Sequence, residues 1–207
     1  MRLDKLLAHT GHGTRKQVRE LIRSGKVKVD GEIVKKHGLH VDPDKNVVTV
    51  FGEKIKYVKY VYLMLNKPQD YLSATYDEHC LTVIDLVPLE YQHFSLAPVG
   101  RLDIDTEGFI LLTNDGKINH RLTSPKNNIW KTYEAHVSGK VRSEHIEQFK
   151  QGIRLDDGYK TKPASLEILD TSAGKSEVRL SITEGKFHQV KRMFQSIGME
   201  VTYLKRT

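Results

Sequence analysis

Residues 100–108, GRLDIDTEG, form an acid-rich segment between two glycines. It places one arginine and three carboxylates within seven residues. Carboxylates in such a cluster can form covalent intermediates, as they do in sugar chemistry. On composition alone, an Asx-turn or an ion-pair cluster without chemistry is the alternative.

Two further segments carry candidate functional side chains. In KTYEAHV, residues 131–137, strand alternation puts Lys131 and Tyr133 on the same face as two apolar residues. In EGKFHQVKRMF, residues 184–194, Lys186, Lys191 and Arg192 bring positive charge to a strand-to-helix junction. The alternatives are a core aromatic for Tyr133 and a surface lysine on an amphipathic helix for Lys191.

The elements that must position these side chains can be read from hydrophobic patterns. YVYLMLNKP predicts a buried strand that ends at Lys67-Pro68, and FILLT predicts another, followed by a turn at 114–116. Residues 178–182 alternate as a strand does. Beyond Gly185, the residues Val190, Met193, Phe194 and Ile197 follow helical spacing.

The first 60 residues have a different pattern. Leucines at 3, 6 and 7 predict a short helix. Thr14 and Gln17 form a capping-box pattern before a second helix, with Gly25 as its C-cap. Asp30-Gly31 predicts a two-residue hairpin turn, and a second hairpin is expected to turn near Gly52.

Charge divides the chain in the same way. Residues 1–60 hold 14 Lys and Arg against 7 Asp and Glu, whereas residues 61–207 hold 19 of each sign. The whole net charge of +7 therefore lies in the first 60 residues. A basic module joined to a neutral one indicates a polyanion-binding arm, with a merely solvated surface as the alternative.

Length and composition exclude several classes of protein. The 207 residues suffice for one ordinary domain and a small one. No apolar run approaches the ~20 residues of a membrane span, and the N-terminus does not resemble a secretory signal. Cys80 is the only cysteine, so no internal disulfide or cysteine-cluster metal site is expected, and the cytoplasm is the expected compartment.

The N-terminal segment RLDKLLAHTGHGTRKQVRELIRSGKVKVDG resembles the S4 RNA-binding module, a helix pair followed by a hairpin. The resemblance implies that this module binds structured RNA through its phosphates. Such contacts position the RNA but do not read its sequence. The candidate RNA-binding residues are all basic: Arg2, Lys5, Arg15, Lys16, Arg19, Arg23, Lys26 and Lys28.

The rest of the chain resembles the pseudouridine synthases that modify small-subunit ribosomal RNA, and their large-subunit relatives. The matching motifs occur in family order: LNKP at 65–68, GRLDIDTEG at 100–108, LLTNDG at 111–116, KTY at 131–133 and EGKFHQVKRM at 184–193. By this resemblance Asp103 is the catalytic aspartate, and Arg101 helps to extrude or replace the flipped nucleotide. Tyr133 stacks on the uracil and takes part in proton removal at C5, and Lys191 is the basic residue paired with the aspartate. Asp105 has no implied catalytic role and is expected to brace the loop.

The implied reaction breaks the N1–C1′ bond, rotates the uracil and joins C5 to C1′. No group is lost, so no cofactor is required. The aspartate adds to C6 of the base or captures C1′ of the sugar; the sequence leaves both open. A cation beside the aspartate keeps it ionised, and an aromatic platform offsets the cost of unstacking the base.

The expected fold is α+β. A small S4 module (1–42) and a hairpin-containing linker (43–59) precede a catalytic domain (60–207) with a mixed, mainly antiparallel sheet. The implied partner is ribosomal RNA or a pre-ribosomal particle, bound by a monomer away from membranes. Two other classes remain: a non-catalytic RNA-binding assembly factor, and a carboxylate glycosidase or nucleosidase for small molecules.

Two features depart from the family pattern. Asp70 stands where relatives commonly have glycine, and aspartate tolerates a positive φ better than most residues. Relatives also continue beyond the position of Thr207, so the catalytic domain is expected to lack its C-terminal end, at some risk to the sheet edge and to activity.

Overall fold

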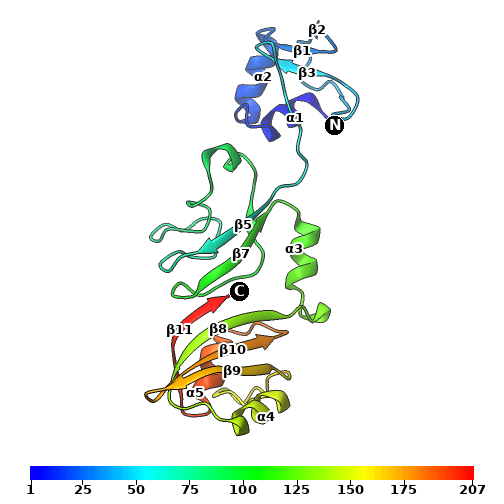
Figure 1. Ribbon diagram of the computed structural model, residues 1–207. Coiled ribbons are helices and arrows are strands. Elements are labelled where there is room, and N and C mark those ends of the chain that lie inside the picture. Colours follow the sequence, from blue (N-terminus) through cyan, green and yellow to red (C-terminus); the bar gives the residue numbers. More distant parts are fainter. The chain divides into compact units, whose positions relative to one another are not determined.

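The computed structural model describes residues 1–207 as two compact units. The N-terminal unit comprises Met1–Val61 with Val87–Leu96, and the synthase-like unit comprises Tyr62–Leu86 with Ala97–Thr207. Each unit has its own strands and helices (Figure 1). No helix is long and apolar enough to cross a membrane.

The N-terminal unit packs two helices on a small sheet of strand order β2-β1-β3-β4. The leucines of the first helix are almost fully buried, as their spacing predicts. Val18 and Ile22 of the second helix are also buried, whereas Leu21, which belongs to the same apolar stripe, is only partly buried. Thr14 forms the expected capping box with Gln17. The elements are α1 (Leu3–His9), α2 (Arg15–Arg23), β1 (Val27–Val29), β2 (Glu32–Ile33), β3 (Val48–Val50) and β4 (Glu53–Lys54).

Both predicted hairpin turns of this unit are confirmed. Asp30 and Gly31 have φ of 53° and 88° between β1 and β2, and Phe51 and Gly52 have φ of 52° and 90° between β3 and β4. Two consecutive positive φ angles give the backbone twist that matches a tight hairpin. Gly25, at φ 75°, follows the last helical turn of α2 as predicted.

A segment from far along the chain completes the N-terminal unit. Val87–Leu96 contains the short 3-10 helix η1 (Leu89–Tyr91). The Phe94 ring meets the His9 ring edge-on, with centroids 5.4 Å apart. The expected ranges, 1–42 for the S4 module and 43–59 for the linker, leave this segment in the catalytic domain. The expected boundaries stay predictions.

The synthase-like unit is built on a seven-stranded sheet, with β5-β7-β11-β8-β10-β9 in order and β6 paired to β7. Only the β7–β11 pairing is parallel, so the sheet is mixed and mainly antiparallel, as expected. The strands are β5 (Tyr62–Lys67), β6 (Ala97–Pro98), β7 (Glu107–Thr113), β8 (Lys131–Ser138), β9 (Ser165–Ser172), β10 (Lys175–Ile182) and β11 (Glu200–Arg206).

In this unit α4 (Ser143–Gln151) packs against β9 and α5 (Gln189–Gln195) packs against β11. The rings of Phe149 in α4 and Phe194 in α5 are buried and lie 5.1 Å apart. Asp115 caps α3 by accepting from the backbone N–H groups of Lys117 and Ile118, so the predicted turn at 114–116 opens a helix. The remaining elements are α3 (Gly116–Thr123), η2 (Pro125–Asn127), α4 (Ser143–Gln151) and α5 (Gln189–Gln195).

Two details of the sequence reading were wrong. The YVYLMLNKP strand forms, but it is not buried: Tyr62 is 48% and Met64 83% exposed. β5 is an edge strand that pairs only with β7, and its alternate side chains face outward. Ile197 also lies beyond the end of α5, which stops at Gln195.

Candidate active site

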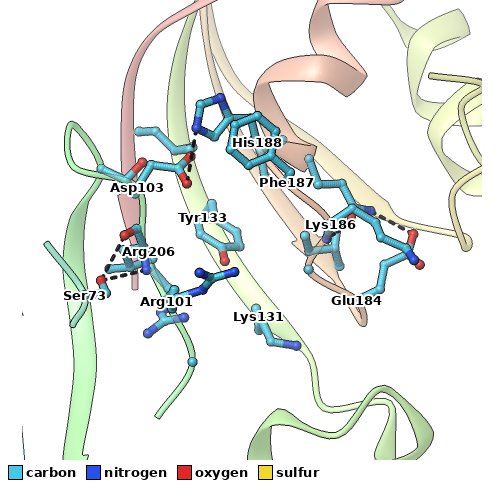
Figure 2. Close-up of a pocket in the computed structure, with 18 of the residues that line it drawn as sticks. Ser73, Arg101, Asp103, Lys131, Tyr133, Glu184, Lys186, Phe187, His188 and Arg206 are labelled. Carbon is cyan, nitrogen blue, oxygen red and sulfur yellow. Dashed lines mark hydrogen bonds and ion pairs between the residues drawn. The ribbon is translucent and has the colours of Figure 1, made fainter. Parts of the chain in front are cut away.

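A cavity of about 460 Å³ opens in the synthase-like unit. That volume is in the range of small-ligand sites. Its lining includes all four residues that the sequence assigned to the reaction: Arg101, Asp103, Tyr133 and Lys191. They come from one loop, a strand and a helix, and Figure 2 shows Arg101, Asp103 and Tyr133 around one space.

Asp103 lies in the loop before β7, with its side chain 31% exposed. Its carboxylate is 3.7 Å from His188 Nε2 and 3.9 Å from Lys191 Nζ. Two groups that can carry positive charge therefore face the carboxylate, and an open side remains for a substrate.

Lys191 makes its short contacts to Asp105, not to Asp103. Its Nζ donates to both carboxylate oxygens of Asp105 at 2.6 Å. Partial burial raises the pKa of Asp105, but the hydrogen bonds and charge of Lys191 outweigh burial and lower it below the ordinary value. Asp105 therefore connects the loop to α5 and holds the lysine within reach of Asp103.

Lys67 supports the acid-rich loop from inside the unit, a role that the sequence reading missed. Its side chain is fully buried, and Nζ donates to the carbonyls of Pro68 at 2.9 Å and Ile104 at 3.1 Å. Burial lowers the pKa of Lys67, and Asp105 and three other nearby carboxylates oppose that shift. The sequence signal for this role is the position of Lys67 at the end of an apolar strand. A charge buried there requires hydrogen-bond or ionic partners.

Two more contacts fix the loop. Asp70, at φ 66°, has the positive φ that its place in the motif suggested, and its N–H donates to the carbonyl of Ile104 at 2.9 Å. The Ser73 hydroxyl both donates to the carbonyl and accepts from the N–H of Leu102, each at 2.9 Å. The residues on either side of Asp103 are thus held through their backbone.

Tyr133 lines the cavity from β8 and is only 8% exposed. Burial raises the pKa of its hydroxyl, the positive charge of Arg206 opposes that rise, and the charge of Asp103 adds to it. The pKa of the Tyr133 hydroxyl thus depends on burial and on two opposed charges.

Arg206 is a second residue that the sequence reading missed. It is the register partner of Tyr133 on β11, it is 8% exposed, and its Nε donates to the carbonyl of Phe109 at 2.6 Å. The sequence around Arg206 does not indicate that it lies next to Tyr133, because the β8–β11 pairing joins segments about 70 residues apart.

Gly108 allows Arg206 to reach this place. A Cβ on Gly108 would lie 2.0 Å from the Arg206 carbonyl oxygen, and φ is 104°. Any side chain at 108 would push β11 away from β7 and carry Arg206 with it. The last glycine of GRLDIDTEG therefore serves strand packing.

The candidate RNA-binding residues lie in the N-terminal unit. Asp4 there is almost buried and lies 2.7 Å from the Arg2 guanidinium and 3.3 Å from that of Arg19. Arg2 and Arg19 therefore neutralise a buried carboxylate. The other six are exposed: Lys5, Arg15, Lys16, Arg23, Lys26 and Lys28.

Comparison with known proteins shows the family. Residues 61–196 match the family model described as RNA pseudouridylate synthase, and residues 1–47 match the S4 domain. A crystal structure of a pseudouridylate synthase shares the fold at a TM-score of 0.66 with 37% identity, covering 100% of this chain and 87% of that one.

Three curated relatives align along nearly the whole chain. An uncharacterized RNA pseudouridine synthase of Bacillus subtilis (strain 168), YtzG, is 51% identical over 100% of this chain and 86% of its own. A ribosomal small subunit pseudouridine synthase A of Vibrio parahaemolyticus is 40% identical, over 100% and 87%. A ribosomal large subunit pseudouridine synthase B of Bacillus subtilis is 41% identical, over 99% and 84%.

The chain belongs to the RNA pseudouridylate synthase family and carries an S4 domain before its synthase domain. It is an RNA-modifying enzyme that binds RNA as its substrate. The resemblance to this family and the α+β architecture expected from sequence are both confirmed.

Proposed function

We propose that this enzyme isomerises one specific uridine of 16S ribosomal RNA to pseudouridine, with Asp103 as the nucleophile. The observation that carries the proposal is the placement of Asp103 in the 460 Å³ cavity that Tyr133 also lines. A carboxylate, an aromatic ring and cationic groups around one cavity are what a flipped uridine requires.

Substrate binding begins with extrusion of the target nucleotide. Arg101 is exposed and lines the cavity, so it can replace the extruded base or hold a phosphate. The uracil enters the cavity and stacks on Tyr133. Stacking contributes about 1–3 kcal/mol per base, which offsets a comparable unstacking cost.

The chemical steps then conserve all atoms. The Asp103 carboxylate forms a covalent bond to C6 of the uracil or to C1′ of the ribose, and the N1–C1′ bond breaks. After the base rotates, C5 bonds to C1′ and the bond to Asp103 breaks. C5 loses its proton, N1 gains one, and Asp103 returns as a carboxylate.

Tyr133 is the candidate for removing the C5 proton. Burial and the charge of Asp103 both raise the pKa of its hydroxyl, so the free enzyme holds it as a neutral phenol. The covalent bond consumes the charge of Asp103 and so removes one cause of the raised pKa, while burial still raises it and Arg206 still lowers it. The phenolate form of Tyr133, which can accept the C5 proton, is therefore easier to reach at the stage when the proton must leave.

The N-terminal S4 module supplies placement on the RNA in this proposal. Its exposed lysines and arginines contact phosphates, and the synthase domain performs the chemistry. The enzyme acts as a monomer in the cytoplasm, on ribosomal RNA or a pre-ribosomal particle. Large-subunit RNA is the second candidate, because the large-subunit relative is as similar as the small-subunit one.

The proposal is tested by mapping pseudouridines in 16S and 23S ribosomal RNA from cells with and without the gene. Loss of one site in 16S RNA supports it, and loss of one site in 23S RNA selects the second candidate. In parallel, purified enzyme should release tritium from C5-labelled uridine in a transcript of the affected RNA while the base stays on the chain. An unchanged map together with no tritium release contradicts the proposed function.

A further inference from the structure

Phe187 and His188 form an aromatic pair beside Asp103 that the fold does not require. Both line the cavity, and their rings stack with centroids 3.8 Å apart and an interplanar angle of 17°. Phe187 is 76% exposed, although burying a phenylalanine side chain stabilises a fold by about 1.5–3 kcal/mol. Its outer ring face is open to solvent, so it contributes little to the core.

The backbone of this pair is held in place. Gln189 is buried; its side chain accepts from the Lys186 N–H at 2.8 Å and donates to Glu184 at 2.8 Å. Glu184 in turn accepts from the Tyr159 hydroxyl at 2.7 Å. The exposed Phe187 ring therefore belongs to a segment that is hydrogen-bonded to buried side chains.

His188 adopts the left-handed region, with φ 46° and ψ 35°, directly before α5. This conformation is uncommon for a residue with a side chain. It accompanies the stacking of the imidazole on Phe187 and the placement of its Nε2 3.7 Å from Asp103. Such strain persists when surrounding contacts hold it, and it is concentrated at functional sites.

We propose that Phe187, supported by His188, stacks on the base of a nucleotide directly adjacent to the target uridine. The proposal rests on the function proposed above and adds a subsite to it. Tyr133 is buried and takes the flipped uracil, so the exposed Phe187 is left for a base that stays outside the cavity. Figure 2 shows His188 facing Asp103 and Phe187 next to His188.

The positive charges near this aromatic pair are consistent with a nucleotide as its ligand. Lys186 precedes the pair, with its Nζ 4.7 Å from the centre of the Tyr159 ring, and Arg101 is exposed elsewhere on the cavity lining. Cations on the lining can hold the phosphates around an extruded nucleotide, and an open aromatic face accepts any base. Stacking of this kind tolerates different base identities, so it anchors the RNA without reading its sequence.

A double-mutant cycle between protein and RNA tests the subsite. The RNAs are synthetic fragments spanning the uridine mapped above, either intact or abasic at the 5′ or the 3′ neighbour. With intact RNA, Phe187→Leu should raise KM roughly five- to a hundredfold with little change in kcat. With the RNA that is abasic at the contacted neighbour, parent and Phe187→Leu should have the same KM, and Phe187→Tyr should behave as the parent throughout.

Tyr76→Ala is the matched control, since Tyr76 is also 76% exposed and does not line the cavity. Its effect should not depend on either abasic site. The inference is overturned if Phe187→Leu matches the parent on intact RNA, or if its loss is the same with all three RNAs. Turnover by the parent separates the two proposals. An inactive parent overturns the function and the subsite together, whereas an active parent without coupling overturns the subsite alone.

Discussion

Asp103 and Asp105 stand two residues apart in one loop but have different surroundings. Asp103 faces the cavity with cationic groups at 3.7 and 3.9 Å, whereas Asp105 accepts two short hydrogen bonds from Lys191. The family resemblance implies that Lys191 pairs with the catalytic aspartate. In the structure its short bonds go to Asp105, which keeps Asp103 free to approach a substrate.

Asparagine at either position separates these roles. We expect Asp103→Asn to abolish turnover while folding and RNA binding stay near normal, because the amide is nearly isosteric but neither charged nor nucleophilic. Asp105→Asn should retain measurable activity, since it loosens Lys191 without removing the nucleophile. Single-turnover tritium release measures both, and the reverse order of activities would mean that the nucleophile is misassigned.

At the scale of elements, the end of β5 and the acid-rich loop are joined through Lys67. Its two hydrogen bonds to carbonyl oxygens link the LNKP and GRLDIDTEG motifs, which are distant in sequence. The positive φ of Asp70 lets the chain turn so that its N–H reaches the same Ile104 carbonyl. The loop that presents Asp103 thus depends on a strand that contributes no side chain to the reaction.

Replacement of Lys67 tests that dependence. Lys67→Met keeps the length of the side chain but removes the Lys67 hydrogen bond to the Pro68 carbonyl oxygen and one of the two hydrogen bonds to the Ile104 carbonyl oxygen, at a cost of about 0.5–1.5 kcal/mol for each. The midpoint of urea unfolding and the single-turnover rate should both fall. Lys175→Met, at an exposed lysine, should change neither. Normal stability and rate in Lys67→Met would show that the loop does not need this support.

In the N-terminal unit, Asp4 joins α1 to α2 through Arg19. Hydrogen bonding to Arg2 is the largest cause that holds the pKa of Asp4 below its ordinary value; burial opposes it and Arg19 adds to it. A lowered pKa in the folded state adds stability above the unfolded pKa of about 3.9, and this is lost as pH falls through the folded pKa.

The free energy of unfolding of Asp4→Asn should therefore lie below that of the parent near neutral pH. The difference should shrink as pH falls below about 4. Urea unfolding followed by circular dichroism, repeated across this range, measures it. A difference that stays constant down to the lowest accessible pH would remove the ionic explanation.

In the whole molecule, the basic excess belongs to the N-terminal unit, and the cavity lined by Asp103 and Tyr133 belongs to the other unit. Each phosphate contact that is lost should lower the slope of log affinity against log salt by about 0.7–0.9. Arg19 is unsuitable for a charge-reversal test because it neutralises Asp4, so its reversal would damage the fold.

Reversal of three exposed cations, Arg15, Lys16 and Arg23, to Glu should weaken RNA binding most at low salt and reduce its salt dependence. The same reversal at Lys140, Lys150 and Lys175 in the synthase domain is the control, because it changes the net charge equally. Filter binding at several salt concentrations distinguishes the two triple variants. Equal losses would indicate a general charge effect and no dedicated binding surface.

The sequence alone determined the division into a basic module and a synthase domain, the hairpin turns, the capping box and the motifs of the site. These features depend on neighbours a few residues apart: an Asp-Gly turn, a threonine cap, a glycine in a loop. Asp103 and Tyr133 belong to recognisable local motifs, GRLD and KTY, and these motifs made them candidates for the site.

The groups that meet around the cavity are set by long-range packing. The sequence does not indicate the partners of Lys67, Arg206 and Lys191, because each contact joins strands or loops from distant parts of the chain. β5 was misread as buried because an apolar run does not reveal whether a strand has one neighbour or two. Local patterns fix local backbone conformation, whereas burial and long-range partners follow from how the whole sheet packs.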